Sequence, residues 1–302
     1  MLATLPRQRS PTASIHDRSA TNAASSLDAM LANELDPAFK RRVPIVLRLL
    51  DPRPGERILD CGCGMGFTLR ALAELYDCEL VGLERDATTA KRASIEVGNG
   101  AAVVNGDALH LPFPDSSFDK VLMTEVLEHI PDERAALHEV RRVLRRGGSY
   151  TMTVPNQNYP FLWDPLNRTL ETVAHTHIPS DIWWLAGIWA DHQRLYTTAT
   201  VRDSLETVGF VVDEIISFTH YCIPFHHFLV YGVGKNLLQR GLLPDGLAKS
   251  ADRFRARENS GSILNPINAA ARFLHWIDRQ NDGLTDPRLS YVGIAVHARK
   301  AS

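Results

Sequence analysis

The sequence contains few cysteines and no long uninterrupted run of apolar residues. Its four cysteines, Cys61, Cys63, Cys78 and Cys222, have the spacing of neither a disulfide framework nor paired zinc-binding C-x-x-C motifs. No stretch reaches about 18 consecutive apolar residues, and the first 25 residues lack the apolar core of a secretory signal. We therefore expect a cytoplasmic protein that neither spans a membrane nor is exported by a signal peptide.

The chain also lacks an excess of charge of one sign. Lys and Arg number 33 and Asp and Glu number 35, which gives a formal net charge of −2 over 302 residues. Without an overall positive charge, nothing attracts nucleic acid to the whole surface, and we expect no nucleic-acid partner. A hydrophobic content of 44% at this length is sufficient to bury a core.

Short apolar runs alternate with helical patterns through the first half of the sequence. Strands that alternate with helices indicate parallel βαβ units, and buried parallel strands have continuous apolar sequences. The alternation therefore predicts an α/β, doubly wound, mostly parallel sheet that binds ligands at the carboxyl ends of its strands. The predicted strands are Arg57–Cys61, Leu80–Glu84, Ala101–Val104, Lys120–Thr124, Tyr150–Val154, Phe210–Ser217 and Tyr291–Ala298, seven in all, and the predicted helices include Thr68–Tyr76, Asp86–Val97, Asp132–Leu144 and Ala199–Val208.

Two segments interrupt this alternation, and a third precedes it. Before the first strand, a helical pattern covers Leu27–Leu35, and Asp36-Pro37 is typical of the cap and first turn of a second helix that ends at Leu50. The expected organisation is a disordered tail (1–25), a cofactor-binding core (26–156), an aromatic insertion (157–195), the core continued (196–220), a second, helical insertion (221–285), and the last core strand with a tail (286–302).

A glycine-rich loop follows the first predicted strand. Gly62, Gly64 and Gly66 allow a sharp turn and a close approach of the backbone to a ligand. Dinucleotide-binding loops have the spacing G-x-G-x-x-G, but Phe67 stands at the position of their last glycine, and no P-loop Lys-Ser or Lys-Thr pair follows. Asp60 precedes the loop, and its carboxylate would repel a pyrophosphate but attract the sulfonium and ammonium groups of S-adenosylmethionine.

Four stretches, in order, resemble the class I S-adenosylmethionine-dependent methyltransferases, in particular the type 11 group that includes ubiquinone, menaquinone and sterol methyltransferases. They are ILDCGCGMG (58–66), LVGLERD (80–86), GDALHLPFPDSSFDKV (106–121) and EVLEHI (125–130). In the turn at 144–148, Arg146 replaces the proline that is usual in the family. The resemblance covers about residues 55–155, 196–210 and the last strand, and it implies a Rossmann-like fold with S-adenosylmethionine as the cofactor.

The resemblance also implies a role for each motif residue. Glu84 is expected to accept hydrogen bonds from both ribose hydroxyls, because a carboxylate is a bidentate acceptor. Asp107 is expected to accept the adenine amino proton, and Ala108 to offer its backbone amide to the ring. The implied cofactor-binding residues are Asp60, Gly62, Gly64, Gly66, Glu84, Arg85, Asp107, Ala108 and Thr124.

Glu125, Glu128 and His129 form the most reactive cluster in the sequence, and three interpretations of it stay open. His129 is the candidate catalytic base, because histidine titrates near neutral pH. The three residues together could instead hold a divalent metal, as a similar pattern does in some relatives, with a further ligand such as His175 or His177. The third interpretation is structural, with the cluster shaping the loop before the helix that begins at Pro131. We expect no metal.

The acceptor site is expected after the fifth strand and in the aromatic insertion, which holds four of the five tryptophans of the chain. Candidate substrate-binding residues are Asn156, Trp163, Trp184, His192 and Tyr196. The prediction is a methyltransferase that acts on a small, hydrophobic or lipid-linked acceptor beneath a lid formed by both insertions. The alternative is a non-catalytic sensor or partner subunit that binds S-adenosylmethionine.

The second insertion combines an apolar stretch, Ile223–Tyr231, with basic residues that include Arg253 and Arg255. Apolar side chains beside cations suit anionic lipid headgroups, so peripheral membrane contact is a further expectation. Packing of the insertions against the sheet, or a dimer interface, would explain the same residues.

Overall fold

In the computed structural model, residues 25–182, 184–225, 228, 252–255, 265–284, 286 and 288–301 are described. Their seven strands form one sheet in the order β3-β2-β1-β4-β5-β7-β6, and all pair in parallel except β7, which is antiparallel to β5 and to β6. The prediction of a seven-stranded, mostly parallel sheet is confirmed. The strands are β1 (Arg57–Cys61), β2 (Glu79–Glu84), β3 (Ala102–Asn105), β4 (Phe118–Thr124), β5 (Leu144–Pro155), β6 (Phe210–Phe218) and β7 (Gly293–Lys300).

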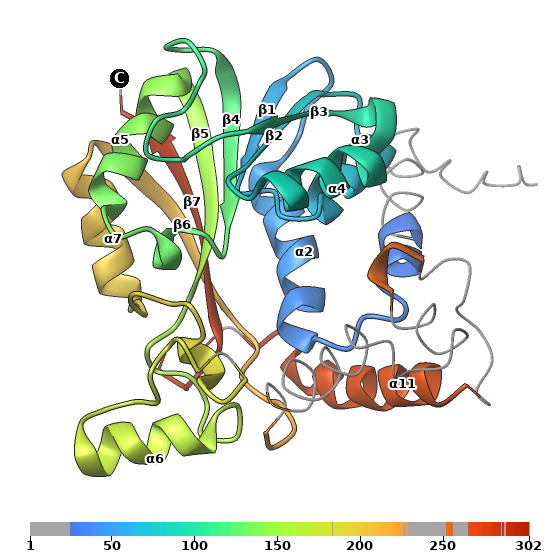
Figure 1. Ribbon diagram of the computed structural model, residues 1–302, viewed down its shortest axis with the longest axis vertical. Helices are drawn as coiled ribbons and strands as arrows, with labels where there is room; N and C mark the ends of the chain where they lie inside the picture. Colours follow the sequence, from blue (N-terminus) through green and yellow to red (C-terminus); the bar gives the residue numbers. More distant parts are fainter. Residues whose placement is uncertain are drawn as a thin grey trace, which may run out of the picture.

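Helices cover both faces of the sheet (Figure 1). On one face lie α2 (Pro37–Leu50), α3 (Phe67–Leu75) and α4 (Ala87–Val97), and on the other α5 (Glu133–Val143) and α7 (Thr198–Thr207). Each helix buries an apolar stripe: Leu69 and Leu72 of α3 and Leu137 and Val140 of α5 are almost completely buried against the strands. The two apolar layers make the sheet a rigid platform, and they leave its carboxyl edge for ligands.

The predicted start of α2 is confirmed. The Asp36 carboxylate accepts hydrogen bonds from the backbone N–H groups of Ala38 and Phe39, at 2.9 and 3.2 Å. Proline at the first helical position lacks an N–H group that the helix could not have used. Residues 25–30 are helical, so helix begins at the last residue that was expected to belong to the disordered tail. The rest of that predicted tail lies outside the described residues.

The first insertion is anchored by buried residues. Asp164 caps α6 (Pro165–Ala174), and its second oxygen accepts the N–H group of Ile188 at 3.0 Å. Trp163 packs with Tyr159 and Ile188 against Val292, the residue before β7. In Figure 1, α6 lies beyond the sheet at the end where β5 leads into this insertion.

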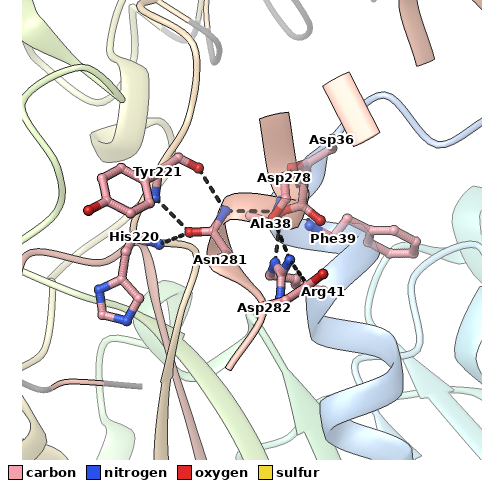
Figure 2. Close-up of polar contacts among 9 residues, drawn as sticks. All are labelled: Asp36, Ala38, Phe39, Arg41, His220, Tyr221, Asp278, Asn281 and Asp282. Carbon is pink, nitrogen blue, oxygen red and sulfur yellow. Dashed lines mark hydrogen bonds and ion pairs between the residues drawn. The ribbon is translucent and has the colours of Figure 1, made fainter. Parts of the chain in front are cut away.

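The described part of the second insertion is α11 (Pro266–Asp278), a short segment at 252–255 and the residues that lead to β7. Figure 2 shows how α11 is held: Arg41 of α2 donates to Asp278 at 2.8 Å and to Asp282 at 2.7 Å. Asn281 accepts the backbone N–H groups of His220 and Tyr221, which follow β6. The end of α11 is therefore fixed to two core elements. Most of the predicted apolar and basic stretch lies outside the described residues.

Among the helices that the structure describes, none is long and apolar enough to cross a membrane.

Candidate cofactor and acceptor site

The glycine loop turns at the carboxyl end of β1. Gly62, Gly64 and Gly66 have φ angles of 82°, 54° and 86°, a region that residues with a side chain rarely adopt. A Cβ atom on Gly62 would lie 2.4 Å from the Val126 side chain, so packing also requires glycine there. A Cβ atom on Gly64 would meet nothing within 4 Å, so Gly64 borders open space. The loop thus exposes backbone where a ligand can approach it.

Asp60 lies beside this loop, and its carboxylate is buried without a hydrogen bond. The residue is 1% exposed, and neither side-chain oxygen has a hydrogen-bond partner. Burial, together with the nearby Glu84 carboxylate, raises the pKa of Asp60 to about 7. A buried carboxylate without a partner is costly, because desolvation is not offset by hydrogen bonds or by a counter-charge. The site is therefore suited to a cationic ligand group.

Glu84 ends β2 and faces the same loop. One carboxylate oxygen accepts the N–H group of Gly64 at 3.0 Å, and the other accepts the N–H group of Asp86 at 2.9 Å. A carboxylate has about four acceptor positions, so two remain for ribose hydroxyls. The neighbouring Arg85 has an exposed side chain. The two backbone bonds fix the orientation of Glu84 before any ligand arrives.

Asn105, at the end of β3, was not predicted as a site residue. Its side-chain amide donates to the carbonyl oxygens of Glu84 and Arg85, at 2.9 and 2.8 Å. It therefore ties the ends of β2 and β3 together behind Glu84. The residue carried no recognisable signal, because an asparagine after a short apolar run is typical of any turn.

Asp107 follows β3, and the N–H group of Gly106 bonds to the Glu84 carbonyl at 3.1 Å. One Asp107 oxygen accepts the N–H group of Leu109 at 3.0 Å, so Asp107 shapes its own turn, and Ala108 is buried within that turn. The structure thus brings the ends of β1, β2 and β3 together, as the motif spacing predicted. Whether Asp107 and Ala108 contact adenine stays a prediction.

Thr124 is the last residue of β4, and Glu125 follows it with a φ angle of 53°. The Glu125 carboxylate accepts the Thr153 hydroxyl at 2.8 Å and pairs with Arg42 of α2 at 3.2 Å. These contacts bind Glu125 to β5 and α2. Glu125 therefore lies outside the cluster that Glu128 and His129 form, in contrast to the three-residue grouping suggested by the sequence.

Glu128 and His129 lie in a single 3-10 turn, Leu127–His129, and the structure brings His192 to them. The Nε2 atoms of His129 and His192 lie 3.9 and 4.0 Å from the same oxygen of Glu128, and the two rings are 4.8 Å apart. Burial, together with Glu125, raises the pKa of Glu128.

His175 and His177, the further metal ligands suggested by the sequence, do not join this cluster. His175 ends α6 in the left-handed conformation. His177 stacks on Trp189, with 3.9 Å between the ring centroids. The histidine that approaches Glu128 is His192, which was predicted as a substrate residue.

Three other predicted substrate residues make contacts inside the protein. Asn156 is buried, and its side-chain amide donates to the Tyr291 carbonyl at 2.9 Å. The Tyr196 hydroxyl donates to Glu133, and Trp163 lies in the buried cluster of the first insertion. Trp184 differs, because more than half of its surface is exposed. The structure therefore leaves Trp184 as the most accessible of the predicted substrate residues.

The sheet order, the glycine loop after β1 and the carboxylates that end β1 and β2 define a class I fold that binds S-adenosylmethionine. Residues 59–152 match the family model described as a methyltransferase domain. S-adenosylmethionine is the cofactor of the domain, and the unpartnered Asp60 fits its cationic methionine end.

Two relatives illustrate the similarity. A sterol 24-C-methyltransferase of Eremothecium gossypii is 34% identical over 169 residues, which are 53% of this chain and 42% of that protein. A probable S-adenosylmethionine-dependent methyltransferase of Mycolicibacterium smegmatis is 27% identical over 182 residues, which are 60% of this chain and 62% of that protein. The chain thus spans less than two thirds of the length of each relative.

A solved structure shows the same fold. A phosphoethanolamine N-methyltransferase of Haemonchus contortus, in complex with phosphomonomethylethanolamine and S-adenosylhomocysteine, superposes with a TM-score of 0.54 at 16% identity. The superposition covers 87% of this chain and 53% of the other. The likeness extends beyond the matched segment, so most of the described chain contributes to one methyltransferase fold.

Proposed function

We propose that the protein transfers a methyl group from S-adenosylmethionine to a small acceptor that is hydrophobic or lipid-linked. The observation that carries this proposal is the Asp60 carboxylate, which is buried, unpartnered and adjacent to the glycine loop. A cationic cofactor supplies the missing counter-charge, whereas a dinucleotide or a nucleoside phosphate would add negative charge.

In this proposal the protein contributes binding and alignment. The bound cofactor supplies an electrophilic methyl group, which an acceptor atom attacks in line. Asp60 holds the cationic end, Glu84 the ribose, and the loop from Gly62 to Gly66 admits the ligand to the backbone. Alignment alone accounts for a large part of the acceleration in such displacements. His129, which is partly exposed beyond β4, is the candidate base for an acceptor that must lose a proton.

The acceptor class is supported by apolar side chains that the first insertion exposes. Phe161, Leu162 and Trp184 are each about half exposed, and they belong to the insertion that follows β5. Apolar surface near the site favours an apolar acceptor. The sterol methyltransferase among the relatives is consistent with this class. We further propose a cytoplasmic protein in peripheral contact with a membrane that supplies the acceptor.

The first prediction tests the cofactor site by calorimetry with S-adenosylmethionine. Glu84→Ala removes an acceptor of two hydroxyl hydrogen bonds, each worth about 1.5–3 kcal/mol with a charged acceptor, so we expect roughly tenfold weaker binding or more. Glu79→Ala is the matched control, because Glu79 begins the same strand, has a largely exposed side chain and pairs with the Nε atom of Arg57, away from the glycine loop. Unchanged affinity in a folded Glu84→Ala protein would contradict the assignment.

Catalysis is tested separately, by single-turnover formation of S-adenosylhomocysteine with sterols, quinones, phospholipids and small hydrophilic acceptors. The proposal expects product with an apolar acceptor. Tight binding of the cofactor without product from any of the acceptors would favour the non-catalytic alternative.

A further inference from the structure

The side chain of Glu128 is completely buried, and neither of its oxygens accepts a hydrogen bond. Buried carboxylates are normally paired with a cation or hydrogen-bonded, because burial removes the water that would solvate their charge. Arg42 and Arg194 affect Glu128 only by longer-range electrostatic attraction, because Arg42 pairs with Glu125 and Arg194 donates to backbone carbonyls. The carboxylate thus has no hydrogen-bond partner, and neither arginine forms an ion pair with it.

The groups closest to this carboxylate in the cluster are two imidazole nitrogens. His129 Nε2 and His192 Nε2 lie 3.9 and 4.0 Å from Glu128 Oε1, which is too far for hydrogen bonds. One ligand atom from each of the three residues lies within 4.8 Å of the others. In a tetrahedral site with bonds of about 2.0–2.1 Å, ligand atoms are roughly 3.3 Å apart. To admit an ion, the two carboxylate–imidazole contacts of 3.9 and 4.0 Å would therefore shorten by about 0.6–0.7 Å, and the widest separation of 4.8 Å by about 1.5 Å.

The orientation of His129 favours metal binding. Its Nδ1 atom lies 2.9 Å from the backbone carbonyl oxygen of Asp191. A carbonyl only accepts hydrogen bonds, so Nδ1 carries the proton and the Nε2 lone pair is directed elsewhere. An imidazole that donates its other N–H to a carbonyl is the usual arrangement of a metal ligand.

The backbone also holds the two parts of the cluster together. The N–H group of Gln193 donates to the Glu128 carbonyl at 2.8 Å, and Arg194 donates to the carbonyl of Ile130 at 2.6 Å. The segment with His192 is therefore fixed to the turn that carries Glu128 and His129. Such a frame limits the rearrangement that binding requires.

From these contacts we propose that Glu128, His129 and His192 bind one divalent transition-metal ion beside the carboxyl end of β4. Two imidazole nitrogens and one carboxylate suit Zn²⁺, Co²⁺, Mn²⁺ or Fe²⁺, whereas Mg²⁺ and Ca²⁺ favour sites made of oxygen atoms. Three protein ligands leave at least one coordination position for a further oxygen ligand. Binding of the ion is independent of the proposed methyl transfer, but any use of the ion to orient an acceptor rests on that function.

The test is titration of the metal-free, full-length protein with Co²⁺, whose visible absorption reports its ligands, and with Zn²⁺ and Mg²⁺ by calorimetry. We expect one Co²⁺ or Zn²⁺ ion per chain, and much weaker binding of Mg²⁺. His192→Asn and His129→Asn each remove a ligand, so their affinity for Co²⁺ should fall by roughly 10–100-fold or more. His175→Asn is the matched control and should bind as the wild type does.

Three results would overturn the site: no binding of Co²⁺ or Zn²⁺, unchanged affinity in both His129→Asn and His192→Asn, or Mg²⁺ bound as tightly as Co²⁺. The His129 side chain is partly exposed, so His129→Asn keeps the test valid if the change at the less exposed His192 prevents folding. S-adenosylmethionine affinity is measured on the same metal-free samples. If the wild-type protein binds S-adenosylmethionine but no metal, only the metal site is contradicted. If it binds metal but not S-adenosylmethionine, only the proposed function is contradicted.

Discussion

The carboxyl group of Asp60 can be protonated or ionised, and a different form is favoured with and without a cationic ligand. Without a cation nearby, burial and Glu84 favour the protonated form of its carboxyl group. A cationic ligand favours the ionised form, because opposite charges at short range lower the pKa of an acid. The ionised carboxylate that we propose to recognise the cofactor is therefore unfavourable in the empty protein above neutral pH, as is common where function and stability conflict.

The second prediction follows from the sign of this shift. The pKa of Asp60 is raised from 3.8 to about 7, so its contribution to stability is fully present below about pH 4 and is lost as the pH rises through about 7. Asparagine does not ionise, so Asp60→Asn removes this pH-dependent loss of stability. Without cofactor, the variant should therefore gain stability relative to the wild type as the pH rises, by up to about 4 kcal/mol above pH 7.

Urea denaturation of both proteins, without cofactor, at about pH 5 and pH 8 measures this difference. Asp203→Asn, on the exposed side of α7, is the control and should show no such trend. A difference between Asp60→Asn and wild type that is the same at both pH values would contradict the prediction.

Local spacing indicated the proposed cofactor residues and the pair Glu128 and His129, but it did not indicate that His192 joins this pair. Asp60 lies at the carboxyl end of β1, and Glu84 lies at the carboxyl end of β2. These two strands are parallel and pair with Cys61 opposite Leu83, so strand pairing alone brings their carboxyl ends together. His192 reaches Glu128 only because the first insertion folds back across the end of β4. No periodicity encodes a contact made by an irregular loop.

At the scale of elements, strand positions were predicted well where both faces of the strand are buried. The prediction for β1 is exact, but β5 begins at Leu144, six residues before the predicted start at Tyr150. Its first part contains Arg145, Arg146 and two glycines, which are atypical of a strand. This part pairs irregularly with β4, with a register shift between Phe118 and Lys120, so only tertiary pairing could reveal it.

The third prediction concerns the joint between α11 and the core, where Asn281 bonds to Asp278 and to the backbone of His220 and Tyr221. Asn281→Ala leaves one buried and one partly buried N–H group without an acceptor, at a cost of about 1–3 kcal/mol for a buried group. We expect a loss of roughly 2–4 kcal/mol in the free energy of unfolding, or local release of α11 with faster proteolysis near residues 279–284.

Chemical denaturation and limited proteolysis, both compared with wild type, measure the two effects. Asp282→Asn is the control, since Asp282 is largely exposed and its ion pair with Arg41 contributes little. Equal stability and equal proteolysis of Asn281→Ala and wild type would show that the joint does not hold α11.

At the scale of the whole molecule, both insertions gather beyond one end of the sheet, with α6 and α11 at the lower edge in Figure 1. On α11, Phe273 and Trp276 are each more than half exposed, and their rings stack with centroids 6.1 Å apart. Arg272 of the same helix and Arg279, which begins the 3-10 turn directly after it, also have exposed side chains. Aromatic rings flanked by cations are typical of a surface that rests on anionic lipid.

The fourth prediction is that the full-length protein co-sediments with vesicles that contain phosphatidylserine, and less so at high salt. Replacing Phe273 and Trp276 by serine should weaken sedimentation by roughly tenfold or more, because each ring contributes about 1.5–3 kcal/mol when buried. Ile95→Ser is the control, because the Ile95 side chain is even more exposed and its helix, α4, lies away from α11 in Figure 1. Absence of vesicle binding under all conditions would exclude the membrane contact.

The sheet order has a consequence for synthesis of the chain on the ribosome. Among the described strands, β6 pairs only with β7, and β7 lies between β5 and β6 although its residues, 293–300, are made after those of every other described strand. The strands that form the cofactor site, β1 to β4, are complete about 170 residues earlier. A nascent chain can therefore assemble the cofactor half while β6 still has no neighbour, and its exposed edge could pair with another chain. Protection by a chaperone would matter most in that interval, and any slowing of translation after β6 would lengthen it.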